Sequence, residues 1–247
     1  MNSSKEKKNL FVGIVGCILF VIGDFLYAAI GPHQSPETFG IMIRSAYLDM
    51  ATWRMAASIF CGILGTALYY VGFRQMYKLL KIHVHEPKQR KWVTGFRISY
   101  LTGTICRGYV HSMFMNTALI FKFVFERYGN IQTAADIANK VFYCNAVPML
   151  TAFIIGDGLL SIVIIVMIWK RIIPLKNTGT RILATFCNPI LCAGIIGNLM
   201  TLLPWPLNQI DVGTESTGHA LVLVLGLILL KNMSKSEIQE KNNGGKQ

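Results

Sequence analysis

LFVGIVGCILFVIGDFLYAAI, residues 10–30, is a continuous apolar run in which Asp24 is the only charged side chain. An α-helix rises about 1.5 Å per residue, so a run of this length can cross the roughly 30 Å of hydrocarbon in a bilayer. The run does not alternate between apolar and polar positions as a barrel strand would, and lipid offers no partner for unpaired backbone groups. It therefore predicts a membrane-spanning helix.

Five further apolar runs of similar length follow along the chain, at residues 53–73, 98–125, 146–169, 182–203 and 212–231. The hydrophobic fraction of 53% and the charged fraction of 15% also exclude an ordinary soluble domain, which could not bury so much apolar surface. We therefore predict an all-α membrane protein, a bundle of six transmembrane helices within residues 1–233. We expect the polar residues 234–247 to form a disordered cytoplasmic tail.

Basic residues are concentrated in alternate connections between the runs. Eighteen of the 24 lysine and arginine residues lie before residue 9, in residues 74–97 and 170–181, or after residue 230. Cytoplasmic segments are rich in such residues, so both termini are predicted to be cytoplasmic. The net charge of +12 then needs no nucleic acid, and membrane lipids are the expected partners of the basic segments.

The first run continues well past Cys17 and carries Asp24, which favours a retained helix over a cleaved signal sequence. The six cysteines form no CxxC pair and no cluster with histidine, so we expect free thiols. Recurrent glycines such as Gly13 and Gly16 favour close helix packing and define no oligomeric state.

Ionisable side chains inside the apolar runs are the strongest functional signal, because a charge at mid-bilayer costs at least about 2.5 kcal/mol. Counting helical rise from the cytoplasmic helix ends places them between the midplane and the outer leaflet. Two pairs of them are four residues apart and share a helix face. We predict that they line an outward-facing, water-accessible pocket together with one polar amide and one arginine at a helix start. The candidate residues are Asp24, Arg54, Arg107, His111, Asp157, Asn198, Glu215 and His219.

Three interpretations of these residues stay open at this point. In the one we prefer, the protein is not an enzyme and has no cofactor, and the pocket binds or translocates a small amphiphilic or ionic ligand, as in a transporter-like protein. In the second, the protein is an intramembrane hydrolase whose water is activated by zinc. Its metal ligands would be His111, His219 and either Glu215 or Asp24.

The third interpretation is a structural or regulatory membrane subunit. Its buried charges would form ion pairs that hold the helices in register, for example Arg107 with Asp157 and Arg54 with Asp24. The sequence contains no P-loop, no GxSxG elbow and no HExxH motif, and thus lacks these signatures of soluble enzymes.

Three dipeptides in the first third of the chain, Gly23-Asp24, Trp53-Arg54 and Gly72-Phe73, carry a family resemblance. With them the chain resembles a small family of uncharacterised bacterial polytopic integral membrane proteins. The resemblance implies a multi-pass protein of the cytoplasmic (inner) cell membrane and implies no known activity.

Overall fold

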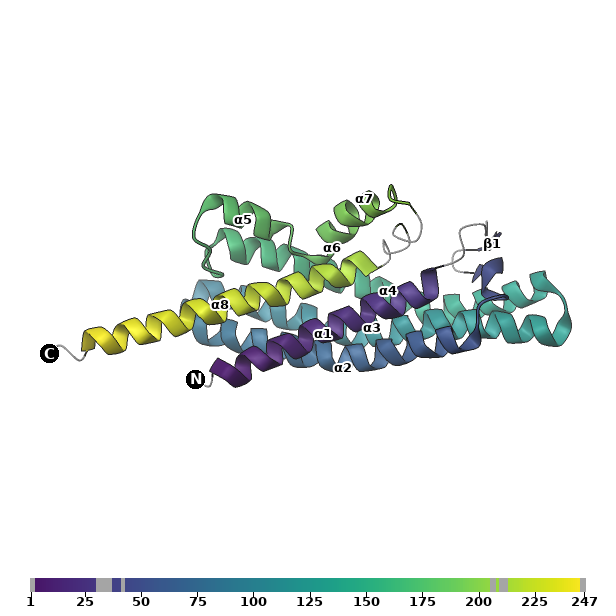
Figure 1. Ribbon diagram of the computed structural model, residues 1–247, viewed down its shortest axis with the longest axis horizontal. Helices are drawn as coiled ribbons and strands as arrows, with labels where there is room; N and C mark the ends of the chain where they lie inside the picture. Colours follow the sequence, from purple (N-terminus) through teal and green to yellow (C-terminus); the bar gives the residue numbers. More distant parts are fainter. Residues whose placement is uncertain (1–2, 30–36, 41–42, 205–207, 209–212, 245–247) are drawn as a thin grey trace.

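The protein is described by a computed structural model that covers residues 3–29, 37–40, 43–204, 208 and 213–244, with residues 234–244 given as backbone. Five long helices run alongside one another (Figure 1). They are α1 (Ser3–Ala28), α2 (Thr52–His83), α3 (Pro87–Tyr128), α4 (Ile131–Trp169) and α8 (Thr214–Gly244). The helical class predicted from the sequence is therefore confirmed.

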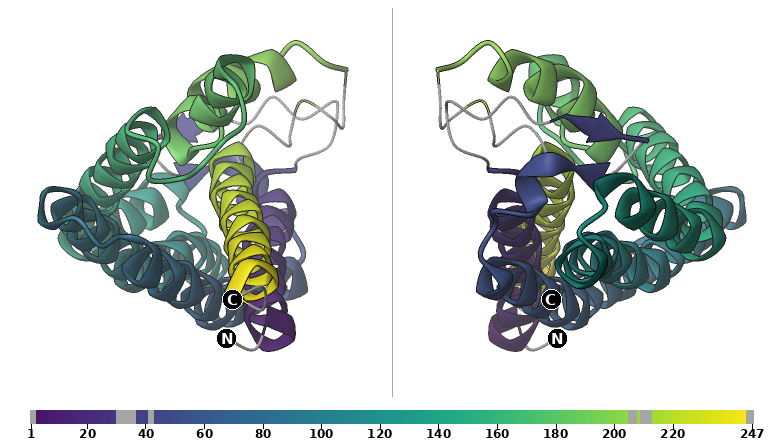
Figure 2. Two further views of the ribbon diagram at one scale, coloured as in Figure 1. Left: turned by 90° about the vertical axis from the view of Figure 1, so that its left-hand side faces the viewer. Right: turned by 90° about the vertical axis from the view of Figure 1, so that its right-hand side faces the viewer.

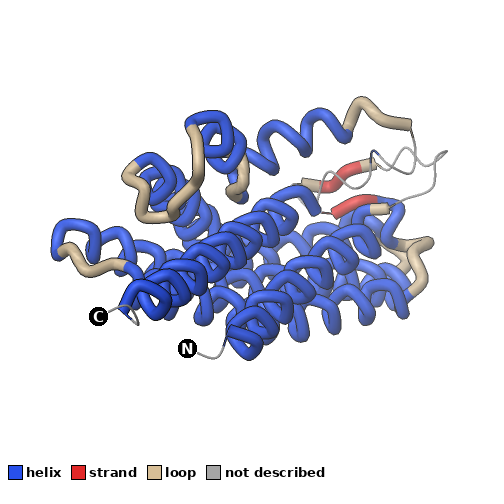
Figure 3. Tube along the Cα trace, turned by 60° about the vertical axis from the view of Figure 1, so that its left-hand side comes forward, coloured by secondary structure: helices blue, strands red, loops and turns tan. Residues whose placement is uncertain are grey.

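Shorter elements connect the long helices. One end of the bundle carries two short antiparallel strands, β1 (Thr38–Phe39) and β2 (Ile43–Arg44), followed by a 3-10 turn, η1 (Ser45–Tyr47) (Figure 3). Between α4 and α8 the chain forms α5 (Thr178–Thr185), α6 (Pro189–Leu191), the π-helical segment η2 (Cys192–Gly197) and α7 (Asn198–Met200).

The helices pack as a closed ring. Each of α1, α2, α3 and α4 contacts the next helix along the chain, α8 contacts α1, and α6 closes the ring between α4 and α8 (Figure 2). At the α1–α2 contact the backbones meet directly, since a Cβ added to Gly13 would lie 2.5 Å from the Cα of Gly72. The ring encloses the polar side chains described below.

Four described helices are long and apolar enough to cross a membrane: Ser4–Ala28, Thr52–His83, Ile131–Trp169 and Thr214–Met233. The bent pair Thr178–Thr185 and Pro189–Met200 could supply a fifth. The helix α3, which contains the predicted run 98–125, is not among the described helices that meet this criterion, because charged and polar residues lower its hydropathy. The structure thus gives four or five apolar spans where the sequence predicts six.

The predicted fifth helix, 182–203, is not continuous. Its two parts meet at an angle of 71°, and the side chain of Asn188 accepts a hydrogen bond from the backbone N–H of Leu191 at 3.0 Å, as a new helix cap. Pro189 explains the break, because proline has no N–H for the preceding turn and disfavours helical geometry in the residue before it. At the other end of the chain, α8 continues to Gly244, into the segment for which we predict disorder.

Candidate functional site

Arg107 of α3 lies at the centre of a buried polar cluster that joins α3, α4 and α8. Its Nη2 donates to Glu215 Oε1 at 2.6 Å and to Asp157 Oδ2 at 3.1 Å. Its Nη1 donates to Ser216 Oγ at 3.2 Å. One guanidinium thus bridges two carboxylates from different helices, and such charge-assisted bonds are the strong ones in a dry interior. The Arg107–Asp157 ion pair considered from the sequence is present.

Aromatic rings surround the same guanidinium. The Cζ atom of Arg107 lies 5.0 Å from the ring centroid of Phe153, 5.2 Å from that of Phe20 and 5.4 Å from that of Tyr69. At these distances the ring quadrupoles attract the cation. Arg107 is itself buried, and low solvent exposure strengthens the attraction between it and its carboxylate partners.

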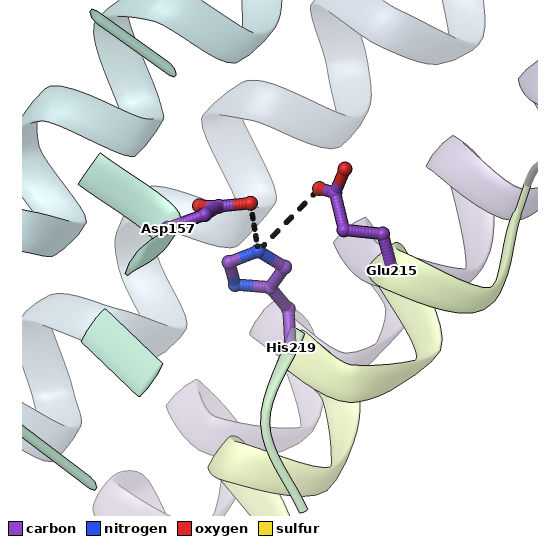
Figure 4. Close-up of side chains that lie close together, drawn as sticks. All are labelled: Asp157, Glu215 and His219. Carbon is purple, nitrogen blue, oxygen red and sulfur yellow. Dashed lines mark hydrogen bonds and ion pairs between the residues drawn. The ribbon is translucent and has the colours of Figure 1, made fainter. Parts of the chain in front are cut away.

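His219 of α8 lies fully buried beside this cluster (Figure 4). Its Nε2 is 3.2 Å from Asp157 Oδ2 and 3.7 Å from Glu215 Oε1, and it also contacts Arg107 Nη2. A protonated Nε2 would donate to Asp157, whereas an unprotonated Nε2 would accept from Arg107. The Tyr69 hydroxyl, 3.2 Å from Nδ1, can donate or accept and so satisfies His219 in either state. The protonation of His219 therefore selects its partner.

The donor set of this cluster also fits a metal in principle, because ligand atoms of Asp157, Glu215 and His219 lie within 4.8 Å of one another. Carboxylate oxygens and histidine nitrogens are both ligand types that zinc accepts. However, Arg107 Nη2 contacts all three of these groups, so a guanidinium nitrogen already lies where a metal ion would have to bind. Arg107 is the cation that this site is built around.

The residues predicted as alternative metal ligands lie in two separate groups. Asp24 and His111 form a separate pair and do not join Glu215 and His219 in any described cluster of metal-ligating side chains. The two residues share a face of α3, but the polar partners of Arg107 are on α4 and α8, whereas those of His111, one turn later, are on α1 and α2.

His111 is held by α1 and α2. Its Nδ1 lies 3.3 Å from Asp24 Oδ1, and its Nε2 lies 2.9 Å from the backbone carbonyl of Ser58. A carbonyl only accepts, so Nε2 must carry the hydrogen of that bond. In a neutral imidazole Nδ1 then carries no hydrogen, and a carboxylate only accepts. Nδ1 and Asp24 can therefore form a hydrogen bond only if the imidazole or the carboxyl group is protonated.

Two glycines form the slot in which the His111 ring lies. A Cβ at Gly62 would lie 2.2 Å from His111 Cδ2, and a Cβ at Gly23 would lie 2.8 Å from Nε2. Ser58, one turn before Gly62, donates from Oγ to the carbonyl of Gly23 at 2.8 Å and so ties α2 to α1 beside the ring. Because neither glycine has a side chain, the His111 ring fits at this position between α1 and α2.

A cavity of about 240 Å³ lies between the two polar groups. Asp24 and His111 line one part of it, and Arg107 and Glu215 line another. The carboxylate-bearing side chains of Asp24 and Glu215 are 26% and 31% exposed, whereas that of Asp157 is only 6% exposed. The remaining wall is mainly apolar and includes Phe20, Tyr27, Phe114 and Phe153. The cavity therefore combines two accessible carboxylates with an aromatic lining.

Asp157 and His219 belong to the Arg107 cluster but do not line the cavity. Two further predicted residues lie outside both polar groups. Arg54 donates to the backbone carbonyls of Leu26 and Ala29 at the end of α1 and, in the described part of the chain, forms no ion pair with Asp24. Asn198 is exposed on α7 and donates to the carbonyl of Gly194. Both side chains satisfy helix carbonyls, which is a structural role.

Sequence reasoning missed three residues of the site: Ser58, Tyr69 and Ser216. Ser58 had a detectable signal, because it lies four residues after Arg54 and four before Gly62, on one face of the second run. Ser216 directly follows Glu215, but adjacent helix residues do not share a face. No local pattern identifies Tyr69 as the partner of His219.

A family model described as "Family of unknown function (DUF6796)" matches residues 1–233 of the chain. No curated protein and no solved structure matches. The match extends the resemblance to an uncharacterised family from the first third of the chain to every candidate residue of the site.

Proposed function

The chain belongs to this family of unknown function, and we propose that it is a polytopic membrane protein whose central cavity binds or translocates a small amphiphilic or ionic ligand. The observation that carries the proposal is the pair of accessible carboxylates, Asp24 and Glu215, in a largely aromatic cavity. A carboxylate inside a membrane bundle is costly, and a ligand that pairs with it removes part of that cost.

The charge of the lining favours a cationic ligand. Arg107 supplies one positive charge, which Asp157 and Glu215 share, and Asp24 adds a third carboxylate. When both imidazoles are neutral, these three carboxylates face a single guanidinium. Aromatic rings also attract organic cations. An amine or quaternary ammonium group on a short apolar chain matches both features.

Ion pairing alone does not account for the whole cluster. Arg107 Nε and Asp157 Oδ1 are buried and have no hydrogen-bond partner among the described residues. Leaving a buried polar atom unpaired costs about 1–3 kcal/mol, so a purely structural network would be expected to satisfy them. They support a site that takes up water or a polar ligand group.

A small organic cation provides the direct test of this function. In nanodiscs, hexyltrimethylammonium is expected to raise the thermal unfolding temperature, whereas hexyl sulfate, with the same chain and the opposite charge, is not. Asp24→Asn and Glu215→Gln should each weaken binding about fivefold, since a partly exposed charge pair contributes about 1 kcal/mol.

The exposed Asn198 supplies the control for that test, because Asn198→Ala changes a polar residue outside the cavity. Its ligand-induced stabilisation should equal that of the wild type. If both carboxylate variants also keep the full stabilisation, the cavity is not the cation site.

For the topology we propose six crossings of a bacterial cytoplasmic membrane, with α3 and the bent α5–α7 segment counted as spans. The polar side chains of α3 at Arg107 and His111 are buried in the bundle and need not face lipid. The beginning of α1 and the end of α8 lie at the same end of the bundle, as an even number of crossings requires (Figure 1). The basic connections assign that end to the cytoplasm.

Cys144 tests the orientation, because it is an exposed free thiol in the part of α4 that the proposed topology puts near the outer surface. A membrane-impermeant maleimide is expected to label it in intact cells, and Cys144→Ser should abolish the labelling. Lys140→Cys in the Cys144→Ser background, one exposed turn farther out, should restore it. Labelling that requires permeabilised cells would reverse the proposed orientation.

A further inference from the structure

We propose that a second cavity, between α5 and α8, binds an anionic phospholipid, with one acyl chain between the helices and the phosphate at two lysines. The cavity has a volume of about 390 Å³, and apolar side chains of both helices line it, among them Leu183, Leu221, Val224 and Ile228. The inference depends on the bundle lying in a membrane and not on what the central cavity binds.

The break between α5 and α6 creates this groove. On α8, a Cβ at Gly218 would lie 2.6 Å from the carbonyl oxygen of Asn188, so the chain at the break touches the α8 backbone. α5 lies before this contact, and the segment Pro189–Met200 follows it at an angle of 71° to α5 (Figure 1). Leu183 on α5 is consequently 71% exposed and Val224 on α8 is 38% exposed, although both face the groove.

The end of the groove toward the C-terminus of α8 is basic. Lys176 and Lys231 line it, and no acidic residue does. Asn232 Nδ2 donates to the carbonyl of Pro174 at 2.9 Å, which fastens the segment carrying Lys176 to the helix carrying Lys231. Neither lysine forms an ion pair with a described residue. Two positive charges are thus held together and available to one phosphate.

The dimensions of the groove match one leaflet. At about 1.5 Å per residue, α8 rises roughly 15 Å between Leu221 and Lys231, which is half of a 30 Å hydrocarbon core. An acyl chain lying along Leu221, Val224 and Ile228 would therefore bring its phosphate to the level of Lys231. An apolar tail joined to an anionic head is the chemistry of a phospholipid.

Native mass spectrometry can test this site with phosphatidylglycerol and phosphatidylcholine that carry the same acyl chains. A lysine near an anionic membrane surface contributes about fivefold to affinity, or about 1 kcal/mol. The double variant Lys176→Gln/Lys231→Gln is therefore expected to lose roughly 30-fold in affinity for phosphatidylglycerol and little for phosphatidylcholine. Val224→Trp fills the groove without changing charge and should weaken retention of both lipids.

The matched control is Lys78→Gln/Lys81→Gln, which removes two exposed lysines from the corresponding end of α2. It should bind phosphatidylglycerol like the wild type. Equal affinity of the wild type for both lipids, or an equal loss in the control variant, would overturn the proposal. So would displacement of phosphatidylglycerol by glycerol phosphate at matched concentration, because the acyl chain would then contribute nothing.

Discussion

Replacing Arg107 by methionine is expected to lower the free energy of unfolding by about 3–5 kcal/mol, which is the cost of leaving buried charges without their partner. Methionine fills a similar length and keeps contact with the rings of Phe20 and Phe153. The loss would therefore report on charge, because the buried carboxylate of Asp157 would remain beside that of Glu215 without a cation. Thermal unfolding of the purified protein in nanodiscs measures the effect.

Neutral partners provide the rescue for the Arg107 variant. Arg107→Met combined with Asp157→Asn and Glu215→Gln has no uncompensated charge in the cluster, and we expect it to recover most of the lost stability. Arg107→Lys should fall between the two, since an ammonium keeps the charge but cannot reproduce the planar fork of donors. A loss below about 1 kcal/mol for Arg107→Met would mean that the carboxylates are solvated or protonated without it.

The helix α3 explains why the two polar groups share one cavity. Arg107 and His111 lie one turn apart on it. The ion pairs of Arg107 go to α4 and α8, whereas the polar partners of His111 are on α1 and α2. The cavity lies among α1, α3, α4 and α8, and the carboxylates that reach it, Asp24 and Glu215, come from α1 and α8. A ligand bound there would contact both groups, and the occupancy of one would affect the other.

The polar layer could be predicted from the sequence because its energetic cost is local. A charged residue in an apolar run is visible without knowledge of its neighbours, and the spacing of Glu215 and His219 gives their common face. Of the eight predicted residues, only Arg54 and Asn198 lie outside the two polar groups. Both lie near helix ends, where a polar side chain can bond to open carbonyls.

The partners could not be predicted, because a membrane helix that is apolar all round does not reveal how it is rotated about its axis. Rotation decides that His111 meets Asp24 and that His219 meets Tyr69. The broken fifth helix is a different case. Pro189 was visible within the run 182–203, and its effect on the preceding turn was sufficient to predict the break.

The glycine slot around His111 supplies the second large effect. Gly62→Ala is expected to lower the free energy of unfolding by about 3 kcal/mol, the upper end of the overpacking range. The new methyl would lie 2.2 Å from His111 Cδ2, and the ring cannot retreat toward Gly23, whose own hydrogen faces it. The ring must leave the slot and lose its contacts with Asp24 and Ser58. Thermal unfolding again measures the change.

A double-mutant cycle separates this steric effect from a general intolerance of α2 to substitution. In the His111→Ala background the slot is empty, so adding Gly62→Ala should cost little, and the two changes should be coupled by about 2 kcal/mol. Gly194→Ala is the matched control, because a Cβ there would meet no atom within 4 Å. Additive losses in the cycle would show that Gly62 is needed for something other than His111. Coupled losses would instead establish that the missing side chain of Gly62 makes room for this histidine at the cavity wall.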